Sequence, residues 1–323
     1  MKYTYLGTTG IEVSRLCLGT MTFGRESDAE TSRAVFDRAV DAGVNFFDCA
    51  NVYASGESER LLGQFLRGRR DQCIVTSKCG FASGEGPRNH RGLSRRHIMQ
   101  AIDASLARLG TDYLDLYFAH YFDAQTPVEE ILRAMDDLVS AGKIRHFGVS
   151  NWSAWQIMKA LGLSHFRGWN RIACVQPMYN LVKRQAEVEI LPMTASEGLG
   201  AITYSPLGGG LLTGKHRFDR RPEGSRLATN EMYGRRYGDI RLFETAEKFQ
   251  GLAEEKHMHC ATLAVAWVAK NPAITAPIIG ARNLEQLEPV LAAGAFDMDP
   301  ELYQTITAFS ETPPPATDRS EER

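Results

Sequence analysis

Four side chains that carry acid–base chemistry stand at or just after the ends of apolar, strand-like runs. Asp48 and Tyr53 belong to the stretch NFFDCANVY. Lys78 ends the run CIVTSK, and His120 ends the run LDLYFAH. Loops that follow parallel strands form one open face of a barrel, so we expect these four side chains to converge there.

These four residue types suit the reduction of a carbonyl by hydride. The developing alkoxide requires a proton, and a tyrosine with an ordinary pKa of about 10 is a poor donor at neutral pH. A cation beside the phenol favours the phenolate, so Lys78 is expected to lower the pKa of Tyr53, with Asp48 neutralising the lysine. His120 would position the carbonyl or share the proton transfer.

Each of these residues also has a structural interpretation. A strand-terminal aspartate often accepts hydrogen bonds in a turn, and a loop tyrosine often serves packing. A lysine can extend its stem along the surface, and a core histidine can bond to backbone. Polar residues at the ends of the later strands favour the chemical interpretation, because a purely structural barrel needs none of them.

The elements that must position these residues form a regular pattern of eight strands, each followed by a helix. The strands are expected at residues 16–19, 46–49, 73–78, 114–120, 147–150, 174–177, 201–205 and 276–280. The helices are expected at residues 29–42, 57–67, 94–109, 127–141, 154–161, 187–197, 240–257, 262–270 and 283–293. This alternation predicts a closed (β/α)8 TIM barrel rather than an open doubly wound sheet.

The barrel is expected to be a single domain spanning residues 1–308. Residues 3–13 read as an N-terminal hairpin, and the proline-rich, charged residues 309–323 as a flexible tail. Ser94 is a predicted N-cap, and so is Thr126, with Pro127 at the first helical position and Gly142 as C-cap.

Two loops interrupt the regular unit, both on the carboxyl side of strands. One runs from Ser205 to Asp239 without clear periodicity, and the other from Phe81 to Gly92. Loops this long in a compact domain are usually lids or ligand clamps.

Composition excludes several function classes. The net charge is -2 and the pI is about 6.5, and no basic block with interleaved aromatics suggests nucleic-acid binding. No apolar run reaches the roughly 20 residues that span a bilayer, and the N-terminus lacks a signal-peptide core. We expect a cytoplasmic protein without a membrane partner, acting as a monomer or weak homo-oligomer.

The six cysteines lack paired spacing and are interpreted as reduced core residues. Strand alternation should turn Cys49 away from the face that Asp48 uses. His257, His259 and Cys260 form the one metal-like cluster, but no second ligand pair accompanies them, so no metal is expected.

The chain closely resembles the aldo-keto reductase superfamily from Leu6 to about Leu291. The matching motifs, in family order and spacing, are GVNFFDCANVYASGESERLLGQFL, IVTSKCG, LDLYFAH, GKIRHFGVSNW, VQPMYNL, ITYSPLGGGLLTGK and IIGARNLEQL.

The resemblance implies NADPH-dependent reduction of aldehydes or ketones, reversible with NADP+. Tyr53 would be the general acid, tuned by Asp48 and Lys78, with His120 orienting the carbonyl. The implied cofactor residues are Thr20, Met21, Ser150, Asn151, Gln176, Tyr204, Ser205, Pro206, Leu207, Gly209, Leu211, Lys215, Gly280, Arg282 and Gln286. Met21 also joins Phe23, Tyr121 and Trp152 in an apolar mouth for the substrate.

Within the cofactor set, Ser150, Asn151 and Gln176 would hold the nicotinamide carboxamide, and Tyr204 would stack on its ring. Arg282 would bind the 2′-phosphate of the adenosine ribose.

No GxGxxG follows a strand, in keeping with a family that binds its nucleotide without a Rossmann fold. Residues 209–215 come close to a phosphate-loop motif, but His216 stands where Ser or Thr is required and no helix is evident. Their glycines would instead let backbone approach the pyrophosphate, with Lys215 as counter-charge.

The chain departs from the family pattern at two places. Pro289 and Val290 replace an acid and an asparagine that face the adenine in related enzymes. Ala54 replaces the more usual glycine after the tyrosine, a change expected to be minor.

Two other function classes remain as alternatives. Potassium-channel β subunits resemble this fold and keep much of its site, although they usually lack the histidine that His120 supplies here. A barrel hydrolase or isomerase would need a metal cluster or paired carboxylates, and neither is visible.

Overall fold

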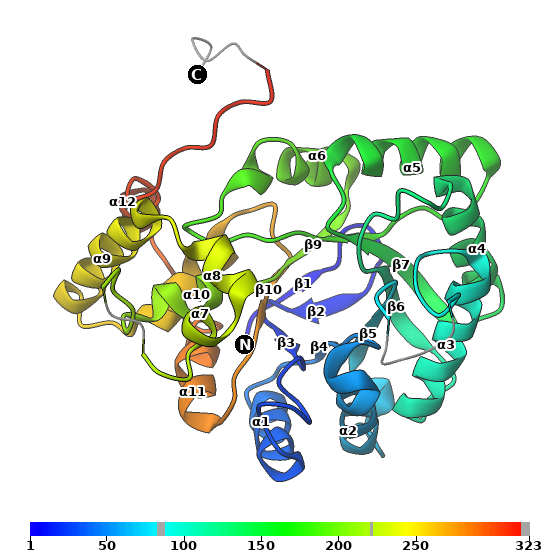
Figure 1. The fold of residues 1–323 in the computed structure, drawn as a ribbon, viewed down its shortest axis with the longest axis horizontal. Coiled ribbons are helices and arrows are strands. Elements are labelled where there is room, and N and C mark those ends of the chain that lie inside the picture. Colours follow the sequence, from blue (N-terminus) through cyan, green and yellow to red (C-terminus); the bar gives the residue numbers. More distant parts are fainter. Residues whose placement is uncertain (83–87, 220–221, 318–323) are drawn as a thin grey trace.

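The computed structural model describes residues 1–82, 88–219 and 222–317. Its centre is a closed barrel of eight parallel strands in the order β10, β3, β4, β5, β6, β7, β8, β9 (Figure 1). The strands are β3 (Cys17–Gly19), β4 (Phe46–Asp48), β5 (Ile74–Cys79), β6 (Leu114–Ala119), β7 (Ile144–Ser150), β8 (Cys174–Gln176), β9 (Gly200–Thr203) and β10 (Ala276–Ile279). The predicted TIM barrel is confirmed.

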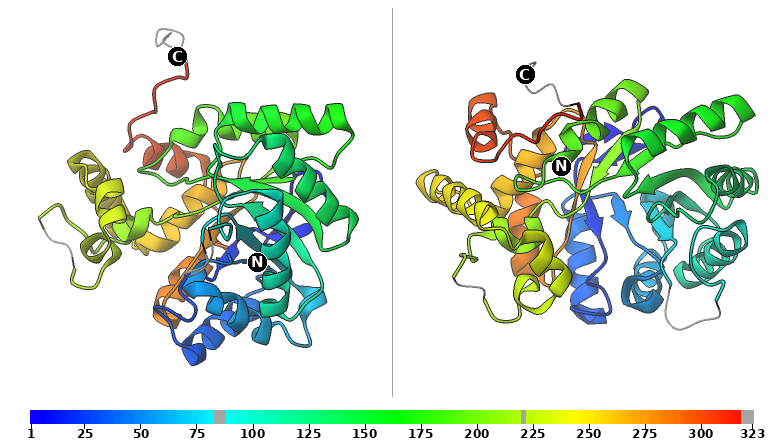
Figure 2. Two further views of the ribbon diagram at one scale, coloured as in Figure 1. Left: turned by 45° about the vertical axis from the view of Figure 1, so that its right-hand side comes forward. Right: turned by 45° about the horizontal axis from the view of Figure 1, so that its top comes forward.

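Helices surround the strands on the outside (Figures 1 and 2). They are α1 (Ala29–Asp41), α2 (Glu57–Phe65), α3 (Arg95–Leu109), α4 (Val128–Ser140), α5 (Ala154–Arg167), α6 (Ile190–Glu197), α7 (Arg226–Thr229), α8 (Glu231–Tyr237), α9 (Ile240–Glu255), α10 (Cys260–Lys270), α11 (Leu284–Ala292) and α12 (Pro300–Thr307). None of the helices in the described ranges is long and apolar enough to cross a bilayer.

The N-terminal hairpin, β1 (Tyr3–Tyr5) and β2 (Glu12–Ser14), covers the amino-terminal end of the barrel. Gly7 lies so close to the start of β9 that an added Cβ would approach the Gly200 nitrogen to 2.5 Å. The hairpin therefore leaves the carboxyl ends of the strands as the open face.

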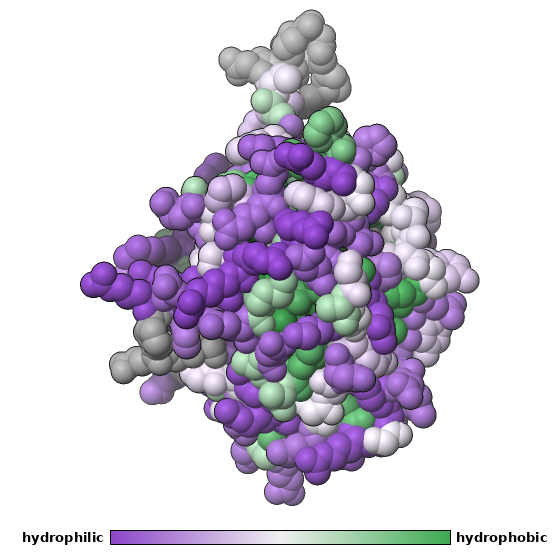
Figure 3. Space-filling view, turned by 90° about the vertical axis from the view of Figure 1, so that its right-hand side faces the viewer, coloured by the Kyte–Doolittle hydropathy of each residue, from purple (hydrophilic) through white to green (hydrophobic). Residues whose placement is uncertain are grey.

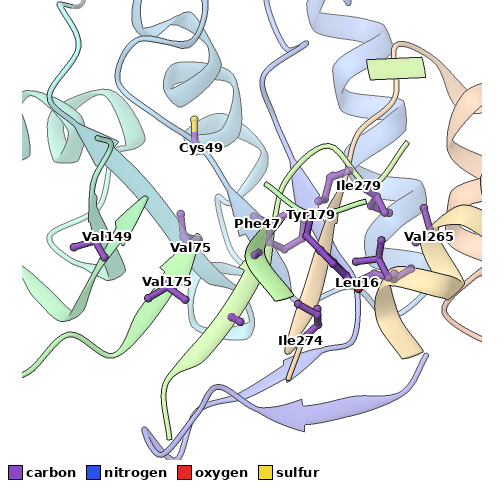
Figure 4. Packing of buried hydrophobic residues seen from close by; sticks show 14 of the residues in the cluster. Leu16, Phe47, Cys49, Val75, Val149, Val175, Tyr179, Val265, Ile274 and Ile279 are labelled. Atoms are coloured by element: carbon purple, nitrogen blue, oxygen red, sulfur yellow. The ribbon is translucent and has the colours of Figure 1, made fainter. Parts of the chain in front are cut away.

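The core has two layers, which strand alternation separates. Phe46 belongs to the cluster inside the barrel, whereas its neighbour Phe47 packs between the strands and the helices. Figure 4 shows Phe47, Val75 and Cys49 in this outer layer. Cys49 thus points away from the face of Asp48, as expected, and burial raises the pKa of its thiol to about 12.

The structure corrects four details of the predicted elements. The N-cap of α4 is Pro127, not Thr126, because the Thr126 hydroxyl bonds to Asp123 instead, and its C-cap is Ala141, one residue before the predicted Gly142. The loop after β9 contains α7 and α8, which are too short to show periodicity. Helix α12 was not predicted, although Asp299 followed by Pro300 is a helix-start signal, and the Asp299 carboxylate caps it.

The first residues of the predicted tail are held by the barrel. Thr245 donates to the Phe309 carbonyl, and Arg184 donates to the Ser310 carbonyl. Beyond Ser310 the chain extends away from the helices (Figure 2), and residues 318–323 lie outside the described residues. The same holds for residues 83–87 of the predicted loop from Phe81 to Gly92, and for residues 220 and 221 of the loop after β9.

Candidate active site

Lys78 lies at the centre of the open face. It projects from β5 into the barrel mouth and has no exposed surface. Its Nζ atom donates to Asp48 Oδ2 at 2.6 Å and to the Cys49 carbonyl at 2.8 Å, and it lies 3.3 Å from the Tyr53 hydroxyl. Burial alone would lower the pKa of Lys78, but Asp48 and Tyr53 outweigh it, and the pKa is raised. The lysine is therefore charged.

Asp48 accepts hydrogen bonds from two residues besides Lys78. Its second oxygen, Oδ1, accepts from the Thr76 hydroxyl and from Gln176 Nε2, each at 2.8 Å. Three donors thus hold a carboxylate that is only 2% exposed, which is the condition under which a buried charge is tolerated. Gln176, predicted for the nicotinamide carboxamide, therefore lies against Asp48.

Tyr53 stands on a tight turn, Tyr53–Gly56, directly after β4 and its short loop. Burial of the phenol raises its pKa to about 12, although Lys78 acts in the opposite direction. The net direction differs from the sequence-based expectation, because a single ammonium at 3.3 Å does not offset the loss of water around the hydroxyl. The phenol is protonated at neutral pH and has a cation beside it to stabilise the phenolate.

His120 completes the group of four. Its ring lies edge-on to Tyr53, with centroids 6.1 Å apart. Its Nδ1 atom is buried without a hydrogen-bond partner among the described residues. Burial, and then Lys78, hold the pKa of His120 well below its ordinary value, so the imidazole is neutral.

Three further predicted residues form a hydrogen-bonded chain beside His120. The Tyr204 hydroxyl donates to Asn151 Oδ1 at 2.7 Å, and Asn151 Nδ2 donates to the His120 carbonyl at 2.9 Å and to the Ser150 hydroxyl at 3.1 Å. Ser150 donates in turn to the Gln176 carbonyl. The residues predicted to face the nicotinamide are therefore neighbours in space, at or directly after the ends of β7, β8 and β9.

A group of cations lies farther out on the same face. Partial burial, and then Arg282 and Arg226, lower the pKa of Lys215. Arg226 lies 3.8 Å from Glu26, but within the described part of the chain no carboxylate forms an ion pair with Lys215 or Arg282. Arg282 donates instead to the Gly224 carbonyl at 3.3 Å.

Residues 15–311 match the model of the aldo/keto reductase family. The chain belongs to the aldo/keto reductase family. An uncharacterized oxidoreductase, YrpG, of Bacillus subtilis is 39% identical over 95% of both chains. A probable voltage-gated potassium channel subunit beta of Oryza sativa is 39% identical over 98% of this chain and 99% of its own. An aldo-keto reductase of Fusarium vanettenii is 32% identical over 91% of this chain and 86% of its own.

Two features of the open face of this aldo/keto reductase are a group of cations and a turn of glycines. The cations Lys215, Arg226 and Arg282 repel one another without a full set of counter-charges, an arrangement that fits a phosphate group. The turn at Gly209 and Gly210 has positive φ angles of 67° and 107°. Because glycine has no side chain, another group can approach this backbone closely.

The loop after β9 in this reductase is braced by its own helices. A Cβ on Gly209 would approach the ring of Tyr233 on α8 to 2.7 Å and that of Tyr237 to 3.1 Å. The two rings are stacked with centroids 6.3 Å apart. Sequence reasoning missed this brace because the tyrosines lie more than twenty residues beyond the glycines.

The other predicted cofactor residues differ in how deeply they are buried. Thr20 is fully buried and bonds to Ser58 and to the Asp48 carbonyl. Pro206 and Leu211 are buried, whereas Gly280 and Gln286 are exposed. Met21, Ser205 and Leu207 are partly buried.

The predicted substrate mouth is partly corrected. Phe23 has no exposed surface and packs edge-on against Phe65, so it belongs to the core between strands and helices. Trp152 is 4% exposed and packs against Phe122 at 5.0 Å. Tyr121 remains partly exposed at the mouth.

Two residues near the site were not predicted. Phe81 is 44% exposed and lies edge-on to His120 at 4.8 Å, beside Tyr121. Its position three residues after Lys78 was the available signal. Thr76, which holds Asp48, precedes Lys78 by two residues and therefore shares its face of β5.

Proposed function

We propose that this chain reduces aldehydes or ketones to alcohols with NADPH, and oxidises alcohols with NADP+ in reverse, with Tyr53 as the general acid. The observation that carries the proposal is the buried chain from Asp48 through Lys78 to the Tyr53 hydroxyl, beside a neutral His120. NADPH, when bound, would supply the hydride. We expect a cytoplasmic monomer or weak homo-oligomer.

The roles of the four residues follow from their contacts. Tyr53 donates its proton to the carbonyl oxygen, and the Lys78 ammonium stabilises the phenolate that remains. Asp48 keeps the lysine charged and directed at the phenol. His120, being neutral, offers a hydrogen bond to the carbonyl without repelling the nearby ammonium.

The cofactor would lie across the open face of the barrel, from Tyr204 to Arg282. Ser150 and Asn151 would hold the carboxamide, and Gln176 would join them by exchanging its bond to Asp48. Tyr204 would support the ring. Lys215 and Arg282 would receive phosphate groups, with Arg282 reading the 2′-phosphate that distinguishes NADPH from NADH.

Steady-state oxidation of NADPH with a generic aldehyde tests the proposal. Wild-type protein should turn over, and Tyr53→Phe should lose about a hundred-fold or more of kcat/KM while NADPH affinity changes little. A variant that keeps more than about a tenth of the wild-type kcat/KM would remove Tyr53 from this role.

Cofactor preference gives a second test. Arg282→Ala should weaken NADPH binding by roughly ten- to a hundred-fold, the range for one charged hydrogen-bonding contact, and leave NADH nearly unaffected. Titration followed by cofactor fluorescence measures both Kd values. Equal losses for both nucleotides would mean that Arg282 supports the loop through Gly224 instead.

A channel-β-like regulatory subunit is the second candidate, because the rice relative named as such matches nearly the whole chain. Such a subunit would bind NADPH tightly and turn over slowly. Rapid aldehyde-dependent turnover favours the enzyme, and tight binding with negligible turnover of several aldehydes favours the subunit.

A further inference from the structure

The proposed chemistry leaves unused the one carboxylate that is fully buried in the described part of the chain. Glu59 on α2 has no exposed surface. Its Oε1 atom accepts from the Ser77 hydroxyl at 2.5 Å, and its Oε2 atom accepts from Arg108 Nε on α3 at 2.6 Å. A charge buried this completely needs its partners, and Arg108 is the only cation paired with it in the described part of the chain.

The same arginine packs against the turn that carries Tyr53. Gly56, the last residue of that turn, has a φ of 94°, and a Cβ on it would approach Arg108 Cδ to 2.8 Å and Nε to 2.9 Å. The arginine stem therefore lies directly on the Gly56 backbone. Arg108 is held in place from its other side by the Ser105 hydroxyl, to which its Nη2 atom donates at 3.2 Å.

That turn needs support from outside. Ala54 and Ser55 both have left-handed backbone angles, with φ of 47° and 53°. Residues other than glycine adopt these angles at a cost, and such a turn persists only where its surroundings hold it. The contact between Arg108 and Gly56 is one such constraint.

Glu59 also holds the strand that carries Lys78. Ser77 immediately precedes Lys78 on β5, and strand alternation turns its hydroxyl outward to α2 while Lys78 points into the mouth. The 3.3 Å separation between Lys78 Nζ and the Tyr53 hydroxyl depends on two backbone segments. The Glu59–Arg108 pair contacts both of them.

We propose that Glu59 and Arg108 form a clamp that sets the separation between Tyr53 and Lys78. Arg108 is then a positioning residue for proton transfer, although it touches none of the four residues at the mouth. The inference rests on the proposed role of Tyr53. The inference adds to that role a pair of charged residues on α2 and α3, outside the barrel strands.

The chain offers a matched control in a second, largely buried ion pair, which contacts the same strand, β5, at its other end. Arg70 Nη2 donates to Asp115 Oδ2 at 2.8 Å, and the same Asp115 oxygen accepts from the backbone nitrogen of Val75 on β5. This pair lies at the amino-terminal end of β5, away from the mouth. Loss of either pair should destabilise the fold, but only loss of the clamp should affect catalysis.

The experiment compares Arg108→Met with Arg70→Met. Both should lower Tm. Arg108→Met should also lower kcat by at least about ten-fold with the carbonyl KM within about two-fold, because misplacement of a reacting group acts on the transition state. Arg70→Met should keep kcat within about two-fold, and Arg108→Lys, which keeps a stem and a charge, should recover most of the rate. A wild-type kcat in Arg108→Met, or equal losses in both variants, would overturn the proposal.

Two additions keep the test decisive. If Arg108→Met does not fold, the double variant Glu59→Gln with Arg108→Met removes both charges, and a wild-type kcat in it would overturn the clamp. Crystal structures of the wild type and the variant test the clamp without turnover. The separation between Lys78 and Tyr53 should lengthen beyond hydrogen-bonding range, and an unchanged separation counts against the clamp even if the protein reduces no carbonyl.

Discussion

Two buried ion pairs lie at opposite ends of the barrel, and their partners differ in kind. At the amino-terminal end, Arg70 bonds to the carbonyls of Cys73 and Tyr113 as well as to Asp115. At the mouth, Lys78 bonds to Asp48 and faces the Tyr53 hydroxyl. Backbone carbonyls do not change protonation state, whereas a phenol does. The chemistry of the third partner, rather than burial itself, separates the pair with a structural role from the pair that we propose to be catalytic.

Backbone strain shows the same asymmetry. Glycines make the left-handed turns after several helices at the amino-terminal side, as Gly110 does after α3. At the mouth, some left-handed angles fall on glycines, such as Gly209, but others fall on residues with side chains, among them Ala54 after β4, Asn151 after β7 and Ser205 after β9. Strain held at such positions is a common property of functional sites, because the chemistry dictates the side chain.

Figure 3 shows a largely hydrophilic face with scattered apolar groups on the side of the molecule that lies to the right in Figure 1. Scattered apolar residues are normal on the surface of a globular protein.

Replacement of the mouth lysine should give the largest effect. Lys78→Met should lower kcat/KM at least a hundred-fold, because the phenolate loses its cation and Asp48 loses its partner. Burial and Asp48 then raise the pKa of Tyr53 further, so the alkaline limb of the rate profile should move to higher pH. The profile of the residual activity measures this, and an unmoved limb with a near-normal rate would mark Lys78 as structural.

Replacement of Arg70, at the amino-terminal end of the barrel, should change the stability of the fold and not the catalytic rate. Arg70→Met leaves Asp115 without its cation and should lower the free energy of unfolding by about 3 kcal/mol, since removing one partner of a buried pair is costly. Denaturant titration measures the loss. The value of kcat/KM should stay within about two-fold below the unfolding transition, and a large fall there would contradict the comparison of the two ends.

Relief of strain at the mouth should give the smallest effect, and a stabilising one. Ala54→Gly removes a left-handed cost of roughly 1 to 2 kcal/mol but adds about 0.5 to 1 kcal/mol of chain entropy, for a net gain near 0.5 to 1 kcal/mol. The control is Ala104→Gly on the exposed face of α3, which should destabilise by about 1 kcal/mol. Equal signs for the two variants would show that Ala54 is not strained.

The backbone angle of Ala54 is a feature that the sequence did not predict. Its substitution for glycine was expected to be minor, because the sequence gives no backbone angle. The structure shows a φ of 47° at this residue, which makes the substitution a source of strain. Alanine has no local preference for this angle, and the turn that contains it packs through Gly56 against Arg108 of α3.

The sequence by itself determined the barrel and the convergence of Asp48, Tyr53, Lys78 and His120. Strand and helix periodicity are local properties, and parallel strands bring their carboxyl ends to one face whatever the loops contain. Only the tertiary structure decided that Gln176 donates to Asp48, that Phe23 faces the core, and that burial outweighs Lys78 in the pKa of Tyr53. All three features depend on contacts between residues that are distant in the chain and on the exclusion of water. The spacing of residues along one strand predicts neither the contacts nor the exclusion of water.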